Sequence, residues 1–223
     1  MPPQIPRARS GVKGDHRLAW PPSAPHATLP LVAQSHLPQE PLALYRRLLD
    51  EGARVELIDG EVVVHAAPGM LHGFGVAGLS SDLYQGYQRG RGGPGGWWIL
   101  IEVDVELAPT LQAYRPDIAG WRRERLQRMP VERPVRVTPD FVCEVLSPTN
   151  ARWDRTQKKE GYERAGVQRY WLLDPGARTL EAYELFEGSY RIAGNIAANG
   201  SGRLPPFDAA LLAMRELFPI DGP

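Results

Sequence analysis

Residues 140–174 read DFVCEVLSPTNARWDRTQKKEGYERAGVQRYWLLD, and this stretch decides the fold class of the 223-residue chain. Residues 140–146 and 168–174 are short, mostly apolar runs that predict buried strands. The residues between them, from about 149 to 165, predict a helix that ends at Gly166, because glycine readily adopts the conformation that closes a helix. A helix of this length suits a crossover between parallel neighbouring strands. The pattern therefore predicts an α/β or α+β fold.

The rest of the chain adds helices, hairpins and strands around this unit. Residues 38–50 have apolar residues at helical spacing and are followed by Gly52, which predicts a first helix. The run VELIDGEVVVH predicts a hairpin at Asp59-Gly60, because both residues accept positive φ. The further elements expected are a helix at 70–88, strands at 97–107 and 114–121, and a terminal hairpin at 178–193. We therefore expect a mixed β-sheet core flanked by helices, with extra hairpins.

The expected strand at 97–107 alternates in its second half. Ile101 and the apolar residues at 103, 105 and 107 fall on one face, which should be buried. Glu102, Asp104 and Glu106 fall on the other face, for which a solvated surface is the simplest interpretation.

Composition limits the class of protein. The chain has 26 Lys and Arg against 26 Asp and Glu, so no global basic field marks it as a protein that coats DNA non-specifically. Its single cysteine, Cys143, excludes an internal disulfide and fits a reducing cytoplasm. We find no apolar run long enough to cross a bilayer and no signal peptide, and expect a cytoplasmic protein without membrane contact. Residues 1–35 are proline-rich and predict an extension before a single domain at 36–223.

Three charged residues stand where the pattern predicts burial or a specific partner. Glu144 interrupts an apolar run, and a buried carboxylate is costly unless it is paired or bound to a metal. Asp117 begins a strand directly after a proline. Lys158 lies on the inward stripe of its helix, four residues after Asp154 and four before Tyr162.

These three residues predict a particular chemistry. Carboxylates on neighbouring strands, Asp117 and Glu144, make a set of hard oxygen ligands suited to Mg²⁺ or Mn²⁺. Such a cation would polarise a phosphate and lower the pKa of a bound water, while Lys158 would orient that water or stabilise the developing charge. Structural interpretations remain open: Asp117 as a strand-start carboxylate, and Glu144 with Lys158 as a buried ion pair.

The phrases VELIDGEVVV, LHG, YRPDIAG, PDFVCEVLSP, WDRTQKKEGYERAGV and RYWLLDP, in this order, resemble the Uma-type restriction endonuclease family of the PD-(D/E)XK nuclease superfamily. The resemblance covers about residues 38–217 and implies a restriction-endonuclease-like fold. It places Asp117 and Glu144 at the two acidic positions of the superfamily. The usual lysine position, two residues after the second acid, is occupied by Leu146. The resemblance implies instead a lysine on the following helix, which Lys158 matches.

The resemblance also implies two further candidates. His72 opens the second helix and would act on the leaving group or contact a phosphate; a hydrogen-bonded histidine at a helix start is the alternative. Glu61 follows the first hairpin turn and would be a secondary metal ligand. An ordinary charge on an edge strand is the simpler interpretation of Glu61.

The sequence thus predicts a metal-dependent endonuclease that hydrolyses DNA phosphodiester bonds with Mg²⁺ or Mn²⁺. The alternative is a catalytically silent nuclease-fold binding or regulatory module, in which the two carboxylates and the lysine form a structural triad. A homodimer is also expected, because enzymes that cut both strands often act as symmetric dimers. DNA would be contacted by basic residues near the site in sequence, namely Arg122, Arg123, Arg152 and Arg155.

Overall fold

The computed structural model describes residues 40–107, 112–148 and 150–218, so the expected extension at residues 1–35 lies outside the described part. The larger sheet contains β3 (Trp97–Ile101), β6 (Ile118–Arg122), β7 (Phe141–Val145), β8 (Arg169–Asp174), β9 (Thr179–Phe186) and β10 (Ser189–Ile196). The smaller sheet contains β1 (Val55–Ile58), β2 (Glu61–Val64), β4 (Val105–Leu107) and β5 (Gln112–Tyr114). Two short strands, β11 (Ser201–Gly202) and β12 (Leu212–Ala213), pair separately.

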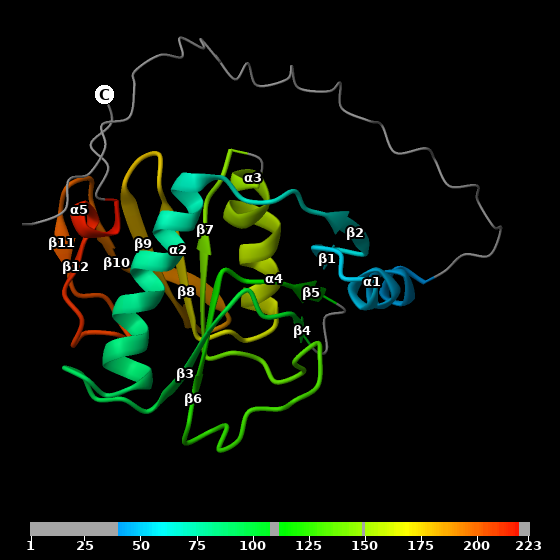
Figure 1. Cartoon of the computed structure of the whole chain (residues 1–223), viewed down its shortest axis with the longest axis horizontal. Coiled ribbons are helices and arrows are strands. Elements are labelled where there is room, and N and C mark those ends of the chain that lie inside the picture. The colour runs from blue at the N-terminus through cyan, green and yellow to red at the C-terminus, as the bar shows by residue number, and fades with distance from the viewer. Residues whose placement is uncertain (1–39, 108–111, 149, 219–223) are drawn as a thin grey trace, which may run out of the picture. The chain divides into compact units, whose positions relative to one another are not determined.

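The helices are α1 (Pro41–Asp50), α2 (Met70–Leu83), α3 (Ala151–Trp153), α4 (Lys159–Arg164) and α5 (Met214–Leu217). Two π-helical turns continue or join them: η1 (Tyr84–Gln88) follows α2, and η2 (Asp154–Lys158) connects α3 to α4. Figure 1 shows α2 in front of the larger sheet and α1 beside the smaller one. Of the described helices, none is both long and apolar enough to span a bilayer.

The larger sheet has the order β10-β9-β8-β7-β6-β3, and its centre is the predicted crossover unit. Strands β7 and β8 are parallel, with Glu144 opposite Leu172, and the helical segment α3-η2-α4 connects them. The neighbouring pairs on either side are antiparallel. The predicted mixed sheet flanked by helices is therefore confirmed.

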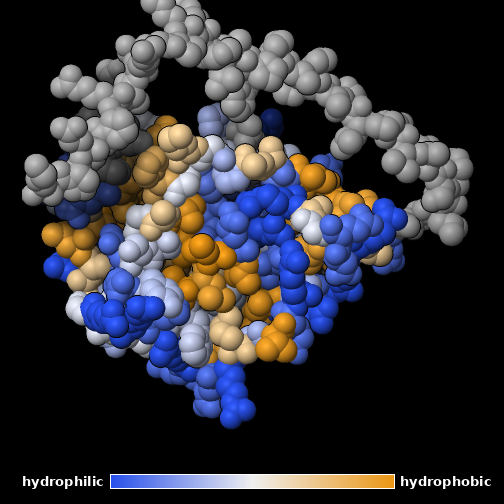
Figure 2. Space-filling view, viewed as in Figure 1, coloured by the Kyte–Doolittle hydropathy of each residue, from blue (hydrophilic) through white to orange (hydrophobic). Residues whose placement is uncertain are grey.

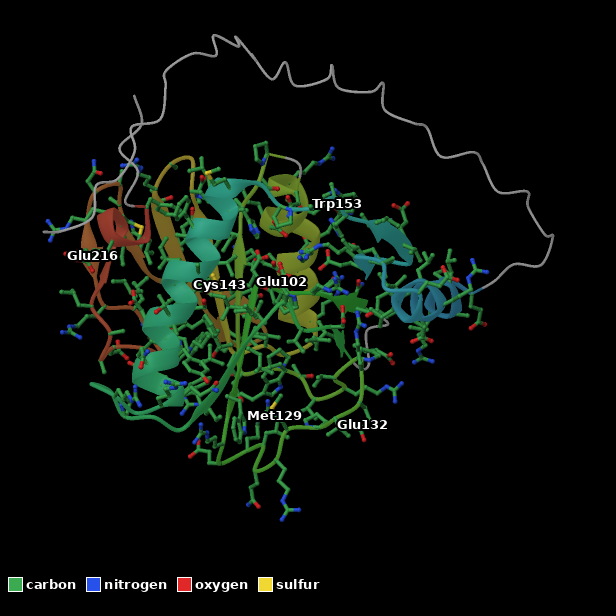
Figure 3. The ribbon with its side chains drawn as sticks, viewed as in Figure 1. Glu102, Met129, Glu132, Cys143, Trp153 and Glu216 are labelled. Atoms are coloured by element: carbon green, nitrogen blue, oxygen red, sulfur yellow. The ribbon has the colours of Figure 1, made fainter. Side chains whose placement is uncertain are left out.

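Two apolar clusters hold helices against opposite faces of this sheet. On one face Val76, Leu79 and Leu83 of α2 pack in a cluster with side chains such as Phe141 and Trp171. Cys143, a free and buried thiol near the middle of the molecule, belongs to the same cluster (Figure 3). The opposite face packs against α4. Its buried residues include Ala119, Trp121, Val142, Tyr162, Tyr170 and Leu172.

The smaller sheet, β2-β1-β5-β4, carries the first hairpin. Its turn has Asp59 at φ 47° and Gly60 at φ 84°, as the Asp-Gly dipeptide predicts. Helix α1 packs on this sheet through the buried side chains of Tyr45 and Leu49. Both features position β1, which contributes a carboxylate to the site described below.

The strands predicted at 97–107 and 114–121 were wrong as single elements. The first divides into β3 and β4, which lie in different sheets, and Glu102 between them has a positive φ of 49°. Asp104 is buried rather than solvated, because Arg115 and Arg133 each contact its carboxylate at 2.6 Å, whereas Ile101 is exposed. The second predicted strand, 114–121, divides into the last residue of β5 and most of β6. Between β3 and β6 the chain therefore passes to the smaller sheet and back to the larger one.

The predicted helix at 149–165 is present from α3 to α4, with the π-helical turn η2 inside it. Single π-helical turns within helices are often found at functional sites. Gly161 in α4 is required by packing, because a Cβ there would stand 2.0 Å from the Tyr114 hydroxyl. This close approach brings the helix against β5 of the smaller sheet.

Candidate active site

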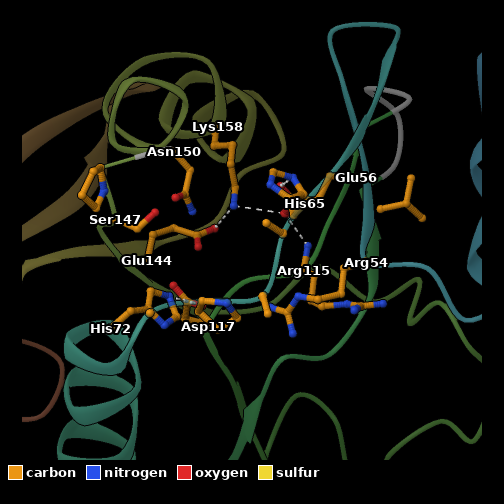
Figure 4. Close-up of a pocket in the computed structure, with 16 residues that line it drawn as sticks. Arg54, Glu56, His65, His72, Arg115, Asp117, Glu144, Ser147, Asn150 and Lys158 are labelled. Carbon is orange, nitrogen blue, oxygen red and sulfur yellow. Dashed lines mark hydrogen bonds and ion pairs between the residues drawn. The ribbon is translucent and has the colours of Figure 1, made fainter. Parts of the chain in front are cut away.

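A pocket with a cavity of about 250 Å³ opens where the two sheets meet. Each side chain that matters comes from a different element: Glu56 from β1, Asp117 from the segment between β5 and β6, Glu144 from β7 and Lys158 from η2 (Figure 4). In the space-filling view, hydrophilic residues gather between α2 and α3, and more hydrophobic ones lie below them (Figure 2). Asp117, Glu144 and Lys158, expected together from the sequence, thus line one pocket.

Lys158 lies at the centre of the charged groups. Its Nζ is 2.8 Å from Glu144 Oε1, 3.0 Å from Glu56 Oε1 and 3.3 Å from Asp154 Oδ1. Burial lowers the pKa of the lysine, but these carboxylates raise it more strongly, to well above its usual value. The lysine is therefore a fixed positive charge. Lys159, in contrast, points elsewhere, with its ammonium over the Tyr183 ring.

Glu144 is 2% exposed, and one of its carboxylate oxygens has polar partners. Its Oε1 accepts a hydrogen bond from the Tyr162 hydroxyl at 2.7 Å in addition to the lysine contact. Burial raises the pKa of the Glu144 carboxyl well above its usual value, and the Asp154 and Asp117 carboxylates add to the rise against the lowering effect of Lys158. A carboxylate in this state gains from a further cation nearby.

Asp117 is fixed from two sides. Its Oδ2 accepts a hydrogen bond from the Val145 backbone N–H at 2.7 Å, which ties it to β7 beside Glu144. Its Oδ1 lies 3.0 Å from Nε2 of His72, the buried histidine in the first turn of α2. Burial lowers the pKa of His72, but the hydrogen bond and charge of Asp117 outweigh it, so the net shift is upward. The predicted candidate His72 is thus brought into the site as a partner of Asp117.

Glu56 is a site residue that the sequence reasoning did not identify. It is 3% exposed, and its Oε1 accepts the Arg115 backbone N–H at 2.7 Å and contacts Lys158. Burial raises its pKa, but Lys158 and His65 lower it more, to about 2. The signal that could have found it is the one used for Glu144, a single carboxylate within an apolar strand run, here VELI.

Asp154 lies in the first position of η2 and is 0% exposed. Neither carboxylate oxygen has a hydrogen bond of good geometry within the described residues, although Oδ1 is near Lys158. Burial raises the pKa of Asp154 to about 6. Its backbone carbonyl, in contrast, accepts the Tyr170 hydroxyl at 2.8 Å, so β8 holds η2 in place.

The donor set fits a divalent cation in charge and chemistry. The carboxylates of Glu56, Asp117, Glu144 and Asp154 are all buried, and three of them, those of Glu56, Glu144 and Asp154, contact the single ammonium of Lys158. Such an excess of negative charge is unfavourable without a compensating cation, and carboxylate oxygens are the ligands that Mg²⁺ and Mn²⁺ prefer. However, within the described ranges no three or more His, Cys, Asp or Glu side chains already converge on one point.

Glu61 does not reach the pocket. It is exposed at the start of β2, directly after the hairpin turn, and it is not among the residues that line the cavity. Its position outside the cavity gives no support to the expected role as a secondary metal ligand, which stays a prediction. The other interpretation, an edge-strand charge, agrees with its position.

The basic residues expected at DNA divide into two groups. Arg122 and Arg123 lie at the end of β6 away from Asp117 and pack on tryptophan rings, Trp97 and Trp98. Arg123 also donates to the carbonyl oxygens of Trp97 and Gln88, so these contacts are structural. Their distance along the strand from Asp117 is a reason against the expected role.

The second group lies on the helix that carries Lys158. Arg152 in α3 is exposed. Arg155 is partly exposed and forms ion pairs with Asp174 at 2.9 Å and Glu181 at 3.3 Å. Arg152 is therefore the better placed of the two for a contact with a phosphate near the pocket.

The fold is similar to that of a protein of known structure. The chain is similar to a solved structure from Anabaena variabilis ATCC 29413, described as "a putative nuclease belonging to DUF820". The TM-score is 0.61 at 19% sequence identity, and the match covers 74% of this chain and 89% of that one. At this identity the similarity establishes the fold. A search of curated proteins finds no match.

The family follows from the sequence profile. Residues 42–210 match the family Uma2, described as "Putative restriction endonuclease". The chain therefore belongs to the Uma2 family, and the resemblance predicted from the sequence is confirmed.

Proposed function

We propose that the protein is a metal-dependent endonuclease that hydrolyses phosphodiester bonds in DNA. The observation that carries the proposal is the pocket lined by the carboxylates of Glu56, Asp117 and Glu144 and by the buried ammonium of Lys158, which contacts Glu56, Glu144 and Asp154. Membership of a family described as restriction endonucleases supports the reaction class. A nuclease fold in the solved relative agrees with it.

Asp117 and Glu144 are the proposed holders of Mg²⁺ or Mn²⁺. The backbone hydrogen bond from Val145 and the His72 contact orient Asp117, and the Tyr162 hydroxyl orients Glu144. When bound, the cation would polarise the phosphate and lower the pKa of a water. The remaining Glu144 oxygen, Oε2, is the one that Lys158 and Tyr162 leave to it.

Lys158 is proposed to stabilise charge rather than to exchange protons. Its three carboxylate contacts keep it protonated, and a fixed ammonium stabilises the charge that develops on a phosphate oxygen during attack by water. Arg54 and Arg115 also line the pocket, and their guanidinium groups form ion pairs with Glu102 and Asp104, respectively.

DNA binding and assembly are part of the same proposal. Phosphate contacts are proposed for Arg152 and Arg155, which lie on the helical segment that carries Lys158. A homodimer is proposed through an outer strand, either β2 of the smaller sheet or β10 of the larger one, because an outer strand has unpaired backbone groups. Cross-linking with size-exclusion chromatography would test the dimer. A cytoplasmic location stays a prediction from the sequence.

The second candidate is a catalytically silent module with this fold. The observation in its favour is that the described carboxylates do not already converge as a metal-binding group. In that case the carboxylates and Lys158 would act as a structural network. Calorimetric titration with Mn²⁺ separates the two functions, because a silent module should release no heat that depends on Asp117 or Glu144.

The direct test is cleavage of supercoiled plasmid DNA by the full chain with Mg²⁺ or Mn²⁺. The wild type should convert the plasmid to nicked and linear forms, and chelation by EDTA should stop this. Glu144→Gln keeps an acceptor for Tyr162 but removes the charge, and should reduce cleavage at least about 100-fold. An intact plasmid over a broad range of metal and pH would overturn the proposal.

A further inference from the structure

Two histidines line the pocket, each beside a carboxylate. His72 lies with Asp117, and His65, which directly follows β2, lies with Glu56, its Nε2 being 2.7 Å from Glu56 Oε2. Figure 4 shows them on opposite sides of the carboxylate cluster. Only His72 was predicted from the sequence. His65 lies at the end of the first hairpin, and the proposed function gives it no role.

The two histidines differ in how a substrate can reach them. The His72 side chain is 6% exposed, one ring nitrogen contacts Asp117, and its Nδ1 is buried without a hydrogen-bond partner in the described part of the chain. The His65 side chain is 22% exposed. Because its Nε2 is buried against Glu56, Nδ1 is the nitrogen left for a substrate. His72 is therefore placed to hold Asp117, and His65 to meet a ligand.

The proposed reaction needs a proton donor for the leaving oxygen, since an alkoxide leaves poorly without a proton. Lys158 keeps its proton, because three carboxylates raise its pKa well above the usual value. Asp154 is 0% exposed and lies on the helix side of Lys158. Glu56 is ionised, with a pKa of about 2. Histidine, in contrast, is the side chain type that exchanges protons near neutral pH.

We infer that His65, held by Glu56, is the proton donor to the leaving oxygen of the phosphodiester; this rests on the proposed function. A water oxygen forms a bond to phosphorus, and the bond from phosphorus to the leaving oxygen breaks. That oxygen keeps the electron pair and takes the proton from His65 Nδ1. The attacking water loses its proton to solvent, and His65 is reprotonated from solvent. The sum is hydrolysis of one P–O bond by one water.

Glu56 is the positioning residue for this step. Its carboxylate connects His65 to Lys158 and to the Arg115 backbone, with contacts of 2.7, 3.0 and 2.7 Å. The buried carboxylate beside Nε2 fixes the orientation of the ring. His65 is fixed in addition by its backbone N–H, which donates to the Arg54 carbonyl at 2.8 Å. The hairpin thus supplies the donor, and β1 orients it.

Leaving-group substitution tests this role. Two DNA oligonucleotides are compared, one normal and one with sulfur in place of the bridging oxygen that leaves; both the 3′ and the 5′ position are prepared. A thiol has a pKa near 8.5, so a thiolate leaves without a donated proton. His65→Gln should slow cleavage of the normal oligonucleotide about 100-fold or more. Its rate on the sulfur-bridged oligonucleotide should stay within a few-fold of the wild type.

His72→Gln is the matched control. It acts through Asp117, so it should slow both substrates by a similar factor. Glu56→Gln should slow the normal substrate more than the sulfur-bridged one, and circular dichroism checks that each variant is folded. Equal slowing of both substrates by His65→Gln, or no slowing, overturns the role of His65 while cleavage by the wild type upholds the nuclease. A wild type that cuts neither substrate overturns both.

Discussion

Lys158 Nζ lies 2.8 Å from Glu144 Oε1, although the lysine is on the helix that follows the glutamate strand. The π-helical turn Asp154–Lys158 sets this contact, and the Tyr170 hydroxyl anchors the turn to β8. The lysine therefore reaches the carboxylates from a helix, above the sheet, rather than from a strand position beside them. Lys158 and its three carboxylate partners therefore interact as one network of charges.

Asp154→Asn should stabilise the protein at neutral pH. Burial raises the pKa of Asp154 from its ordinary value of 3.8 to about 6, so the folded state prefers the protonated acid. The protein therefore loses stability as the pH rises from about 4 through 6, and the full loss is reached above this range. The variant should gain about 1–3 kcal/mol at pH 7.5 and nothing at pH 3.5. Urea unfolding at the two pH values measures this. A loss of stability at pH 7.5 would show that the Asp154–Lys158 attraction outweighs burial.

Glu56→Gln should have the opposite pH dependence. Lys158 and His65 lower the pKa of Glu56 to about 2 against the raising effect of burial, so its stabilising effect is present above pH 4.5. It is lost as the pH falls through 2. The variant should be about 3 kcal/mol less stable than the wild type at neutral pH, and the difference should shrink below pH 4. Thermal melting across this range gives the result, and a constant difference from pH 3 to 7 would contradict it.

Glu61 and Asp117 should differ in their effect on metal binding. Glu61 is exposed outside the cavity, whereas Asp117 is buried beside Glu144. Isothermal titration with Mn²⁺ should give the same affinity for Glu61→Gln as for the wild type. Asp117→Asn should weaken binding at least 10-fold. A clear loss of affinity in Glu61→Gln would instead support the metal role that the sequence suggested for it.

Arg152 and Arg123 should separate DNA binding from folding. Arg152 is exposed on the helix of Lys158, so Arg152→Ala should lower the salt slope of DNA binding by about one. Arg123 packs on Trp98 and bonds two backbone carbonyls, so Arg123→Ala should lower the melting temperature and leave the salt slope unchanged. Fluorescence anisotropy at several salt concentrations compares them. The opposite pattern would move the DNA surface to the end of β6.

Local patterns predicted the centre of the fold well. The strands that contain Glu144 and Trp171 are apolar runs, and the helix between them ends at a glycine. These local signals depend on few distant contacts. The Asp59-Gly60 turn was predictable for the same reason, since its backbone conformation is set by two residues. The inward stripe of the helix likewise indicated that Lys158 is buried, as the structure shows.

What escaped prediction depends on contacts between distant segments. The alternation at 97–107 indicated one strand, but Asp104 is buried by Arg115 and Arg133 from other segments, and the chain changes sheets at Glu102. Glu56 likewise looked ordinary within a short strand, because its partner Lys158 lies far along the chain. A single-sequence pattern cannot contain such pairings, as they arise only when the two sheets meet.

The most direct test of the central claim is a crystal structure of the protein soaked in Mn²⁺, with anomalous diffraction recorded near the manganese edge. The account predicts one strong anomalous peak bonded to carboxylate oxygens of both Asp117 and Glu144, and its disappearance in Glu144→Gln crystals. The absence of a peak at saturating Mn²⁺, or a peak only at other residues, would contradict the metal-dependent nuclease.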